Sequence, residues 1–184
     1  DLSNESSKFV SRNLYSQIDF LENEKDKYLE LFKSNKHIYR PIRNLMTIPG
    51  ISLIRANIIT AIVCQPARFI NKHRFWGYCM LVRHIQISGG KIYGNKRIHG
   101  RRELRDVFIG AAESALRTET TLRDYHDCLR VKGVSAKNAK VALARKIAGL
   151  ALNLLKNNET YNDNYEEYLK ERKRLRLLVG QKKH

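Results

Sequence analysis

The stretch SAKNAKVALARKIAGLALNLLK, residues 135–156, decides the fold of this chain. Its apolar side chains recur at helical spacing and form one stripe, made of Ala139, Leu143, Ile147, Leu150 and Leu154. Lysine and arginine decorate the other faces, and Ser135 is of a residue type that caps helix N-termini. The sequence therefore predicts a long amphipathic helix whose stripe packs against a helical core.

Further helices are expected upstream of this one. One apolar helix is predicted from about Ser52 to Cys64 and is ended by Pro66, and helical patterns resume near Asn71, Arg101 and Thr121. Gly133 suits the end of the helix that precedes Ser135. The segment from His84 to Tyr93, with its β-branched and glycine residues, is the one that looks extended. These patterns predict a mainly α fold.

The N-terminal part has the pattern of a coiled coil. Between about Ser7 and Phe32, a seam recurs at alternating spacings of four and three residues, formed by Leu14, Ile18, Leu21, Lys25, Tyr28 and Phe32. Fewer than four heptads is short for an isolated coil, so a long helix packed on its own domain is an equal alternative. Acidic residues occupy the other positions, which favours a protein partner over a nucleic acid for this helix.

The chain divides into three parts on these patterns. Residues 1–46 form the coiled-coil-like segment, 47–158 the compact helical domain, and 159–184 a tail whose Lys170–Leu178 stretch predicts a basic amphipathic helix. No apolar run is long enough to span a bilayer, so neither a membrane nor secretion is expected. Three cysteines without CxxC spacing argue against disulfides and zinc and suit a reducing cytoplasm. Because the chain opens without Met, we expect it to be part of a longer protein.

Charge indicates what the compact domain binds. The formal net charge is +17, and the 72 residues from Leu31 to Arg102 hold 14 Lys or Arg and no Asp or Glu. Soluble surfaces normally mix both signs, so such a stretch is suited to lie against phosphate. The same lack of carboxylates means that this window cannot itself hold the Mg²⁺ ions of a nuclease.

Inside the window, Ile48-Pro49-Gly50-Ile51-Ser52 is typical of the turn in a helix-hairpin-helix module. Glycine permits a tight turn with positive φ, and the free amides at the start of the next helix then face a phosphate. Ser52 stands where a second glycine is usual and could cap that helix. An ordinary turn before a helix is the alternative. If DNA binds here, the contact should be independent of base sequence.

The second motif is Ser88-Gly89-Gly90, followed by a run of cations: Lys91, Lys96, Arg97, Arg101, Arg102 and Arg105. A serine flanked by glycines can be presented on an exposed turn, where its hydroxyl could attack a phosphate while nearby cations stabilise the developing charge. A solvated loop is the alternative, and on composition alone it is the commoner one.

Taken in order, these motifs resemble the C-terminal domain of the insertion-sequence one-ten and one-sixteen family of transposases, which includes the Piv-type DNA invertases. The resembling residues run from Leu45 to Lys156: Thr47 to Ile51 with Ala56 and Ala61, Arg68-Phe69, Tyr78 with Leu81, Ser88 to Gly90, Gly100 to Arg105, Ala111-Ala112, Lys132-Gly133 and Ala142 to Lys146. An ordered set of this kind is more specific than any one motif.

The resemblance implies a function and a division of labour. It implies that Ser88 is the catalytic nucleophile, which attacks a DNA phosphodiester to form a phosphoserine intermediate. It also implies that a RuvC-like domain outside this chain holds Mg²⁺ with acidic residues, that a structured guide RNA is a partner, and that chains assemble into oligomers, here through the N-terminal helix. The isolated chain should bind DNA without cutting it.

We therefore predict a fragment of a DNA transposase or recombinase of a mobile insertion sequence, cytoplasmic and associated with the bacterial nucleoid. Ser88 is the candidate nucleophile; no metal ligand and no cofactor are assigned within this chain. The candidate nucleic-acid-binding residues are Gly50, Ser52, Lys91, Lys96, Arg97, Arg101, Arg102, Arg105, Arg145 and Lys146. Two alternatives are a non-catalytic helix-hairpin-helix module that binds nucleic acid and a coiled-coil assembly adaptor.

Overall fold

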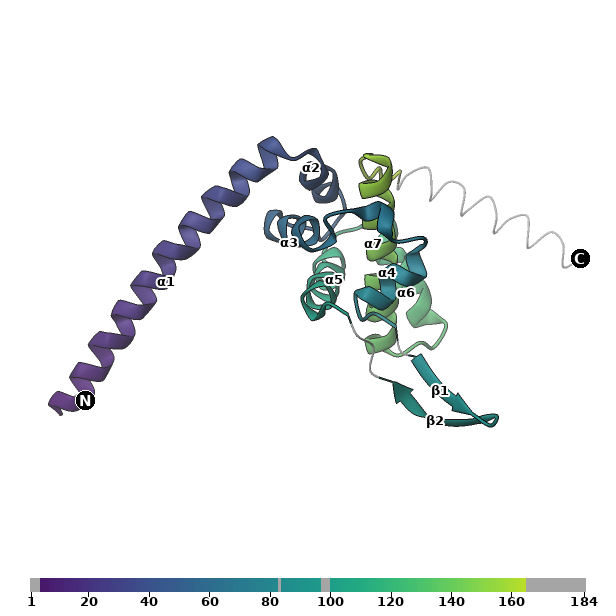
Figure 1. The fold of residues 1–184 in the computed structure, drawn as a ribbon, viewed down its shortest axis with the longest axis horizontal. Helices are drawn as coiled ribbons and strands as arrows, with labels where there is room; N and C mark the ends of the chain where they lie inside the picture. The colour runs from purple at the N-terminus through teal and green to yellow at the C-terminus, as the bar shows by residue number, and fades with distance from the viewer. Residues whose placement is uncertain (1–3, 83, 97–99, 165–184) are drawn as a thin grey trace, which may run out of the picture.

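Helices dominate the computed structural model, which describes residues 4–82, 84–96 and 100–164. The order is α1 (Glu5–Ile38), α2 (Arg40–Met46), α3 (Leu53–Val63), a 3-10 turn η1 (Pro66–Arg68), α4 (Lys72–Tyr78), β1 (His84–Ser88), β2 (Lys91–Lys96), α5 (Arg102–Ala115), α6 (Thr121–Val131) and α7 (Ala136–Asn157). The mainly α prediction is confirmed (Figure 1).

Helix α7 is the centre of the fold. It contacts α2, α4, α5, α6 and η1, and the stripe read from its sequence faces the core: Ala139, Leu143 and Ile147 are fully buried. Alanines on α5 and α7, such as Ala111 and Ala148, are also fully buried and let helices approach closely. The long amphipathic helix is thus confirmed, with the core on its predicted face.

Side chains fix where the helices begin. Four N-cap residues each accept a hydrogen bond from the backbone N–H three residues later: Ser52, Asn71, Thr120 and Ser135. At the end of α6, Gly133 has φ +82°, its N–H bonds to the carbonyl of Arg130, and the N–H of Val134 bonds to the carbonyl of Leu129. This pair of bonds is a Schellman motif, so Gly133 ends the helix as its sequence position predicts.

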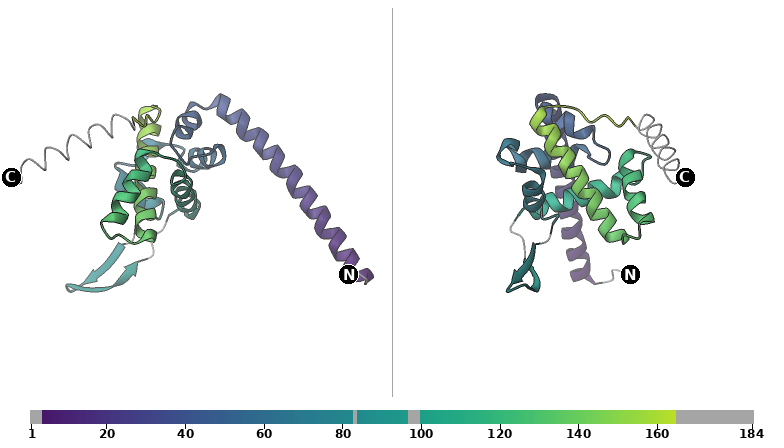
Figure 2. Two further views of the ribbon diagram at one scale, coloured as in Figure 1. Left: turned by 180° about the vertical axis from the view of Figure 1, so that it is seen from behind. Right: turned by 90° about the vertical axis from the view of Figure 1, so that its right-hand side faces the viewer.

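Helix α1 extends away from the rest of the chain as an arm (Figures 1 and 2). No residue of α1 is buried, and the seam is exposed, with Ile18 at 49% and Leu21 at 63% of full exposure. Its C-terminal end contacts α2 and α3, where the Asn35 amide donates to the Asn57 side-chain oxygen at 3.1 Å. Within the described residues, most of the seam therefore has no packing partner.

The segments next to the predicted domain boundaries pack with the core. Ile42 and Leu45 of α2 are buried among the core residues. After α7 the chain turns back, and the Tyr161 N–H donates to the Thr47 hydroxyl while Asp163 accepts from the Thr121 N–H. The expected helix over Lys170–Leu178 lies outside the described residues.

Candidate nucleic-acid interface

Ser88 ends a strand at the tip of a two-stranded hairpin. Strands β1 and β2 are antiparallel, and Ser88 is paired with Lys91 across a loop of two residues, Gly89 and Gly90. Both glycines have positive φ, +55° and +75°, which is the requirement of a type I′ turn and explains the glycine pair. The hairpin projects from the helical bundle with this turn at its far end (Figure 1). The strand that was expected over 84–93 is thus a hairpin that extends to Lys96.

The structure brings some of the candidate residues together and separates others. Lys91 is exposed beside Ser88 at the turn, whereas Lys96 pairs with His84 near the opposite end of the hairpin. Arg97 lies outside the described residues, as do the side chains of Ser88 and Lys96. Arg101 directly precedes α5. It therefore lies beyond the base of the hairpin, away from the turn at Gly89 and Gly90.

At that base, Tyr78 lies between two arginines. The Arg101 guanidinium donates to the Tyr78 hydroxyl at 3.4 Å, and the Arg68 guanidinium lies 4.8 Å from the centre of the Tyr78 ring. Desolvation alone would raise the pKa of Tyr78, but hydrogen bonds from Arg101 and Arg68 outweigh it and lower the pKa of the phenol. The cluster is rich in positive charge and exposed, which is suitable for a phosphate.

Sequence reasoning missed this cluster as a site, although Arg68 and Tyr78 belong to the resemblance. The residues are ten and 23 positions apart, and Arg101 reaches Tyr78 because the hairpin starts and ends at one place. Gly100 makes that return possible: a Cβ there would lie 2.4 Å from the Tyr78 carbonyl oxygen. The Arg101 N–H donates to the same carbonyl at 2.8 Å.

The other two arginines of this run share a carboxylate. Arg102 Nε lies 3.7 Å and Arg105 Nη1 3.9 Å from the carboxylate of Asp106. All three side chains are exposed, so these pairs are weak. Asp106 nevertheless cancels part of the positive charge that was assigned to this end of α5, and a phosphate there must compete with it.

The turn at Gly50 faces helix α5. Gly50 has φ +89°, and a Cβ added to it would lie 2.1 Å from the Ala111 carbonyl oxygen. Arg55 fastens the turn, because its guanidinium donates to the Gly50 carbonyl and to the Ser114 hydroxyl, both at 2.8 Å. The glycine is thus required by packing. Ser52 caps α3 as expected, and contact of the turn with DNA stays a prediction.

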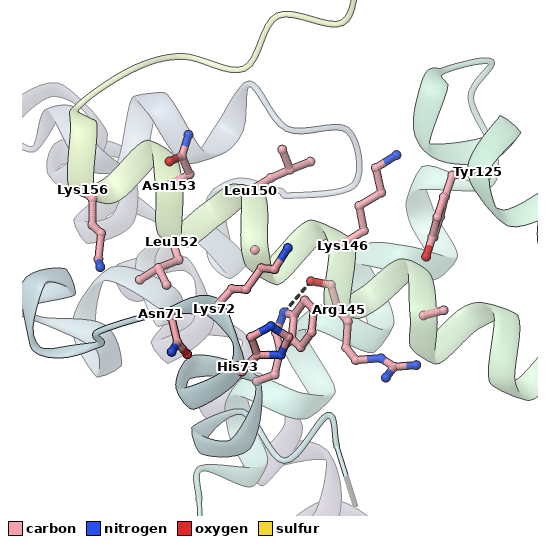
Figure 3. Close-up of a pocket in the computed structure, with 13 residues that line it drawn as sticks. Asn71, Lys72, His73, Tyr125, Arg145, Lys146, Leu150, Leu152, Asn153 and Lys156 are labelled. Atoms are coloured by element: carbon pink, nitrogen blue, oxygen red, sulfur yellow. Dashed lines mark hydrogen bonds between the residues drawn. The ribbon is translucent and has the colours of Figure 1, made fainter. Parts of the chain in front are cut away.

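Arg145 and Lys146 lie on α7 in a groove whose described lining residues include none from the hairpin. The groove has a volume of about 940 Å³ and is formed by α4, α6 and α7 (Figure 3). Of the described residues, four cations and no acidic side chain line it; the cations are Lys72, Arg145, Lys146 and Lys156. Sequence analysis found two of the four. It missed Lys72 and Lys156 because they come from a short helix and from the last turn of α7.

Among residues 4–82, 84–96 and 100–164, no three His, Cys, Asp or Glu side chains form a group that could hold a metal ion. The described residues therefore do not fit the Mg²⁺ of a nuclease. No described helix is both long enough and apolar enough to cross a membrane.

The glycine turn, the hairpin that ends at Ser88 and the Arg68–Tyr78–Arg101 cluster all lie in one part of the chain that is similar to known proteins. Residues 42–127, from α2 into α6, match a family model of transposases. The model is that of the transposase IS116/IS110/IS902 family, so this part of the chain is similar to the family that the order of motifs indicates. The match includes Gly50, the hairpin and Arg101 to Arg105, and ends before α7. No curated protein matches the chain.

Proposed function

We propose that this chain is the DNA-binding, serine-bearing part of a transposase and that Ser88 is its nucleophile. The observation that carries the proposal is the hairpin itself: in a chain that is similar to a transposase family, a type I′ turn places Ser88 and Lys91 at the end of an arm. A projecting arm can reach a DNA backbone that the helical bundle cannot approach. The turn is also free of packing, because a Cβ added to Gly89 or Gly90 would meet no described atom within 4 Å.

The proposed step is an exchange at phosphorus. The Ser88 hydroxyl oxygen forms a bond to the phosphorus of a phosphodiester, the bond to one ester oxygen breaks, and that oxygen leaves as the DNA hydroxyl after it takes up a proton. The hydroxyl proton of Ser88 passes to a general base. Exposed cations such as Lys91 would stabilise the charge on the phosphate oxygens.

The Arg68–Tyr78–Arg101 cluster has a separate part in the proposal. Because it lies at the hairpin base, it would hold a phosphate at a distance from the one that Ser88 attacks, and so position the DNA along the arm. The acidic metal-binding domain that the resemblance implies would act on the DNA from elsewhere. The proposal expects the chain alone to bind DNA and, with Mg²⁺ added, to leave it uncut.

The test is covalent trapping in the protein that carries its acidic domain. Wild-type protein should form a denaturant-stable adduct with DNA, and Ser88→Ala should lose the adduct while duplex affinity stays within about twofold. Ser34→Ala, an exposed serine on α1, is the matched control and should keep the adduct. An adduct that persists in Ser88→Ala removes Ser88 from the mechanism. If no adduct forms although DNA binds, a non-catalytic binding module is the better description.

We further propose that α1 joins two copies of the chain through its exposed seam. Ile18 and Leu21 are exposed on a helix that has no buried residue, and such an apolar face is stabilised by a partner helix. Sedimentation of the full chain should show a dimer, which Ile18→Lys should dissociate. Asn23→Lys adds the same charge on the opposite face and should not. A wild-type chain that stays monomeric at all concentrations would contradict the proposal.

A further inference from the structure

The groove between α4, α6 and α7 has the features of a second ligand site. Its volume, about 940 Å³, lies in the range of sites that enclose small molecules. Its residues come from α4, from the middle of α6 and from α7, and α7 lies beyond the segment that matches the transposase family. The groove is therefore separate from the hairpin that carries Ser88, and an inference about it does not rest on the chemistry of Ser88.

No acidic side chain of the described residues lines the groove, so its cations are not neutralised from that part of the chain. Among the described residues, the Arg145 guanidinium has no hydrogen-bond or ion-pair partner. Lys146 is half-buried over the Tyr125 ring, 4.4 Å from its centre, and burial lowers the pKa of its ammonium. Of the acidic groups that the structure describes, Asp163 is the one whose charge reaches Lys146, and it already accepts a hydrogen bond from the Thr121 N–H. An anion in the groove would offset the desolvation of these cations.

Aromatic rings line the same groove and are held in place. The indole N–H of Trp76 donates to the Arg145 carbonyl oxygen at 2.8 Å, and His73 contacts the indole edge-to-face at 4.8 Å between ring centres. The Lys72 ammonium lies 5.6 Å from the centre of the Trp76 ring. Trp76 and Tyr125 are both partly exposed. Trp76 therefore offers a fixed planar surface beside Lys72, and Tyr125 offers a second ring beside Lys146.

This combination selects for one class of ligand. Cations suit phosphates, and planar rings suit bases, which stack on aromatic side chains when they are unpaired. A duplex hides its bases and offers the rings nothing to stack on. We propose that the groove binds an unpaired polynucleotide strand, with phosphates at Arg145 and Lys72 and a base against Trp76 or Tyr125.

Trp76 reports on this groove directly, because it is the chain's one tryptophan. Its fluorescence should be measured with the full chain and three probes: an oligothymidylate, an oligouridylate and a mixed-sequence duplex of equal length. Each of the two single-stranded probes should quench the Trp76 emission saturably. The duplex should quench it only weakly, even at concentrations where anisotropy shows that the duplex binds. The strand affinity should fall with salt at a log–log slope of about −0.7 for each neutralised phosphate. If the oligothymidylate quenches more strongly, the strand that the groove binds is DNA; if the oligouridylate does, the strand is RNA.

Variants distinguish binding in the groove from nonspecific attraction of a polyanion to a basic protein. Arg145→Ala and Lys72→Ala should each weaken strand binding, roughly tenfold for loss of a charge-assisted phosphate contact. Lys137→Ala removes the same charge from an exposed position on α7 outside the groove and should change the affinity less than about twofold. Thermal unfolding checks that each variant is folded.

Three results would overturn the proposal: strands that bind by anisotropy without quenching Trp76, a duplex that quenches as strongly as a strand, or equal losses in Arg145→Ala and Lys137→Ala. None of them bears on whether Ser88 forms an adduct, so failure here is distinguishable from failure of the proposed function.

Discussion

The substitution Gly50→Ala tests the packing role of the turn before α3. A methyl group at this position would lie 2.1 Å from the Ala111 carbonyl oxygen and 3.0 Å from the Ala115 nitrogen. Both atoms belong to the backbone of α5, which cannot rotate aside as a flexible side chain can. The methyl group must therefore push the turn away from α5, and with it the Arg55 hydrogen bonds to Gly50 and Ser114.

The expected cost has two parts. A non-glycine residue at φ +89° costs roughly 1–2 kcal/mol, and overpacking against a fixed backbone costs roughly 1–3 kcal/mol more. The reduced freedom of the unfolded chain returns about 0.4–1 kcal/mol. A net loss of about 2–4 kcal/mol should lower Tm by on the order of 10 °C in a chain of this size.

The matched control is Gly133→Ala. Gly133 has a similar φ of +82° but no atom within 4 Å of a Cβ position, so that variant carries the conformational cost without the clash. Both variants should be compared with the wild type by chemical and thermal unfolding. Gly50→Ala should be the less stable by about 1–3 kcal/mol. Equal stability of the two variants would refute the view that close approach to α5 requires glycine at position 50.

Three further predictions concern side chains around the same core. Arg55→Met should reduce the free energy of unfolding by about 2 kcal/mol, because the Gly50 carbonyl and the Ser114 hydroxyl lose their donor; chemical denaturation measures this. Burial raises the pKa of the Cys79 thiol, so Cys79 should resist alkylation in the folded chain while exposed Cys64 reacts; mass spectrometry of the labelled peptides distinguishes them. Because the pKa of Tyr78 is lowered, Tyr78 should ionise before an ordinary tyrosine in an absorbance titration, and Arg101→Leu should move that ionisation to higher pH. By linkage, the stabilising effect of this shift is complete above the unfolded-state pKa and is lost as pH falls through the folded-state value.

Local signals made the helices predictable from sequence. Ser52, Asn71 and Ser135 cap the helices that begin after them, and each was placed at a helix start by residue type and by the apolar pattern that follows. Gly133 ends α6 through a left-handed conformation that glycine adopts readily. These effects act within a few residues, so the sequence alone contains them.

The arrangement of the site was less predictable, because it depends on contacts between distant residues. Sequence proximity grouped Ser88 with Arg101, but a hairpin of two strands places the serine at its tip and the arginine beyond its base. The same topology joins Arg101 to Tyr78, which no local pattern indicates. Gly50 is predicted from sequence to permit a tight turn with positive φ, but the sequence does not indicate that this turn packs against the backbone of α5. A glycine in the sequence permits its backbone to approach another group closely, but it does not indicate which group that is.

These contacts explain why the stretch from Leu31 to Arg102 contains no Asp or Glu. Several cations at its ends or beyond it are paired with carboxylates: Lys33 lies 2.6 Å from Glu30, Lys140 2.7 Å from Glu113, and Arg123 3.7 Å from Asp127. Within it, Arg68 and Arg101 contact a phenol, and Lys72 lies near an indole ring. A ring or a hydroxyl orients a cation without cancelling its charge, whereas a carboxylate does both. A surface that must hold its arginines and lysines in place and still attract phosphate therefore needs aromatic partners in place of acidic ones, as residues 68–101 have.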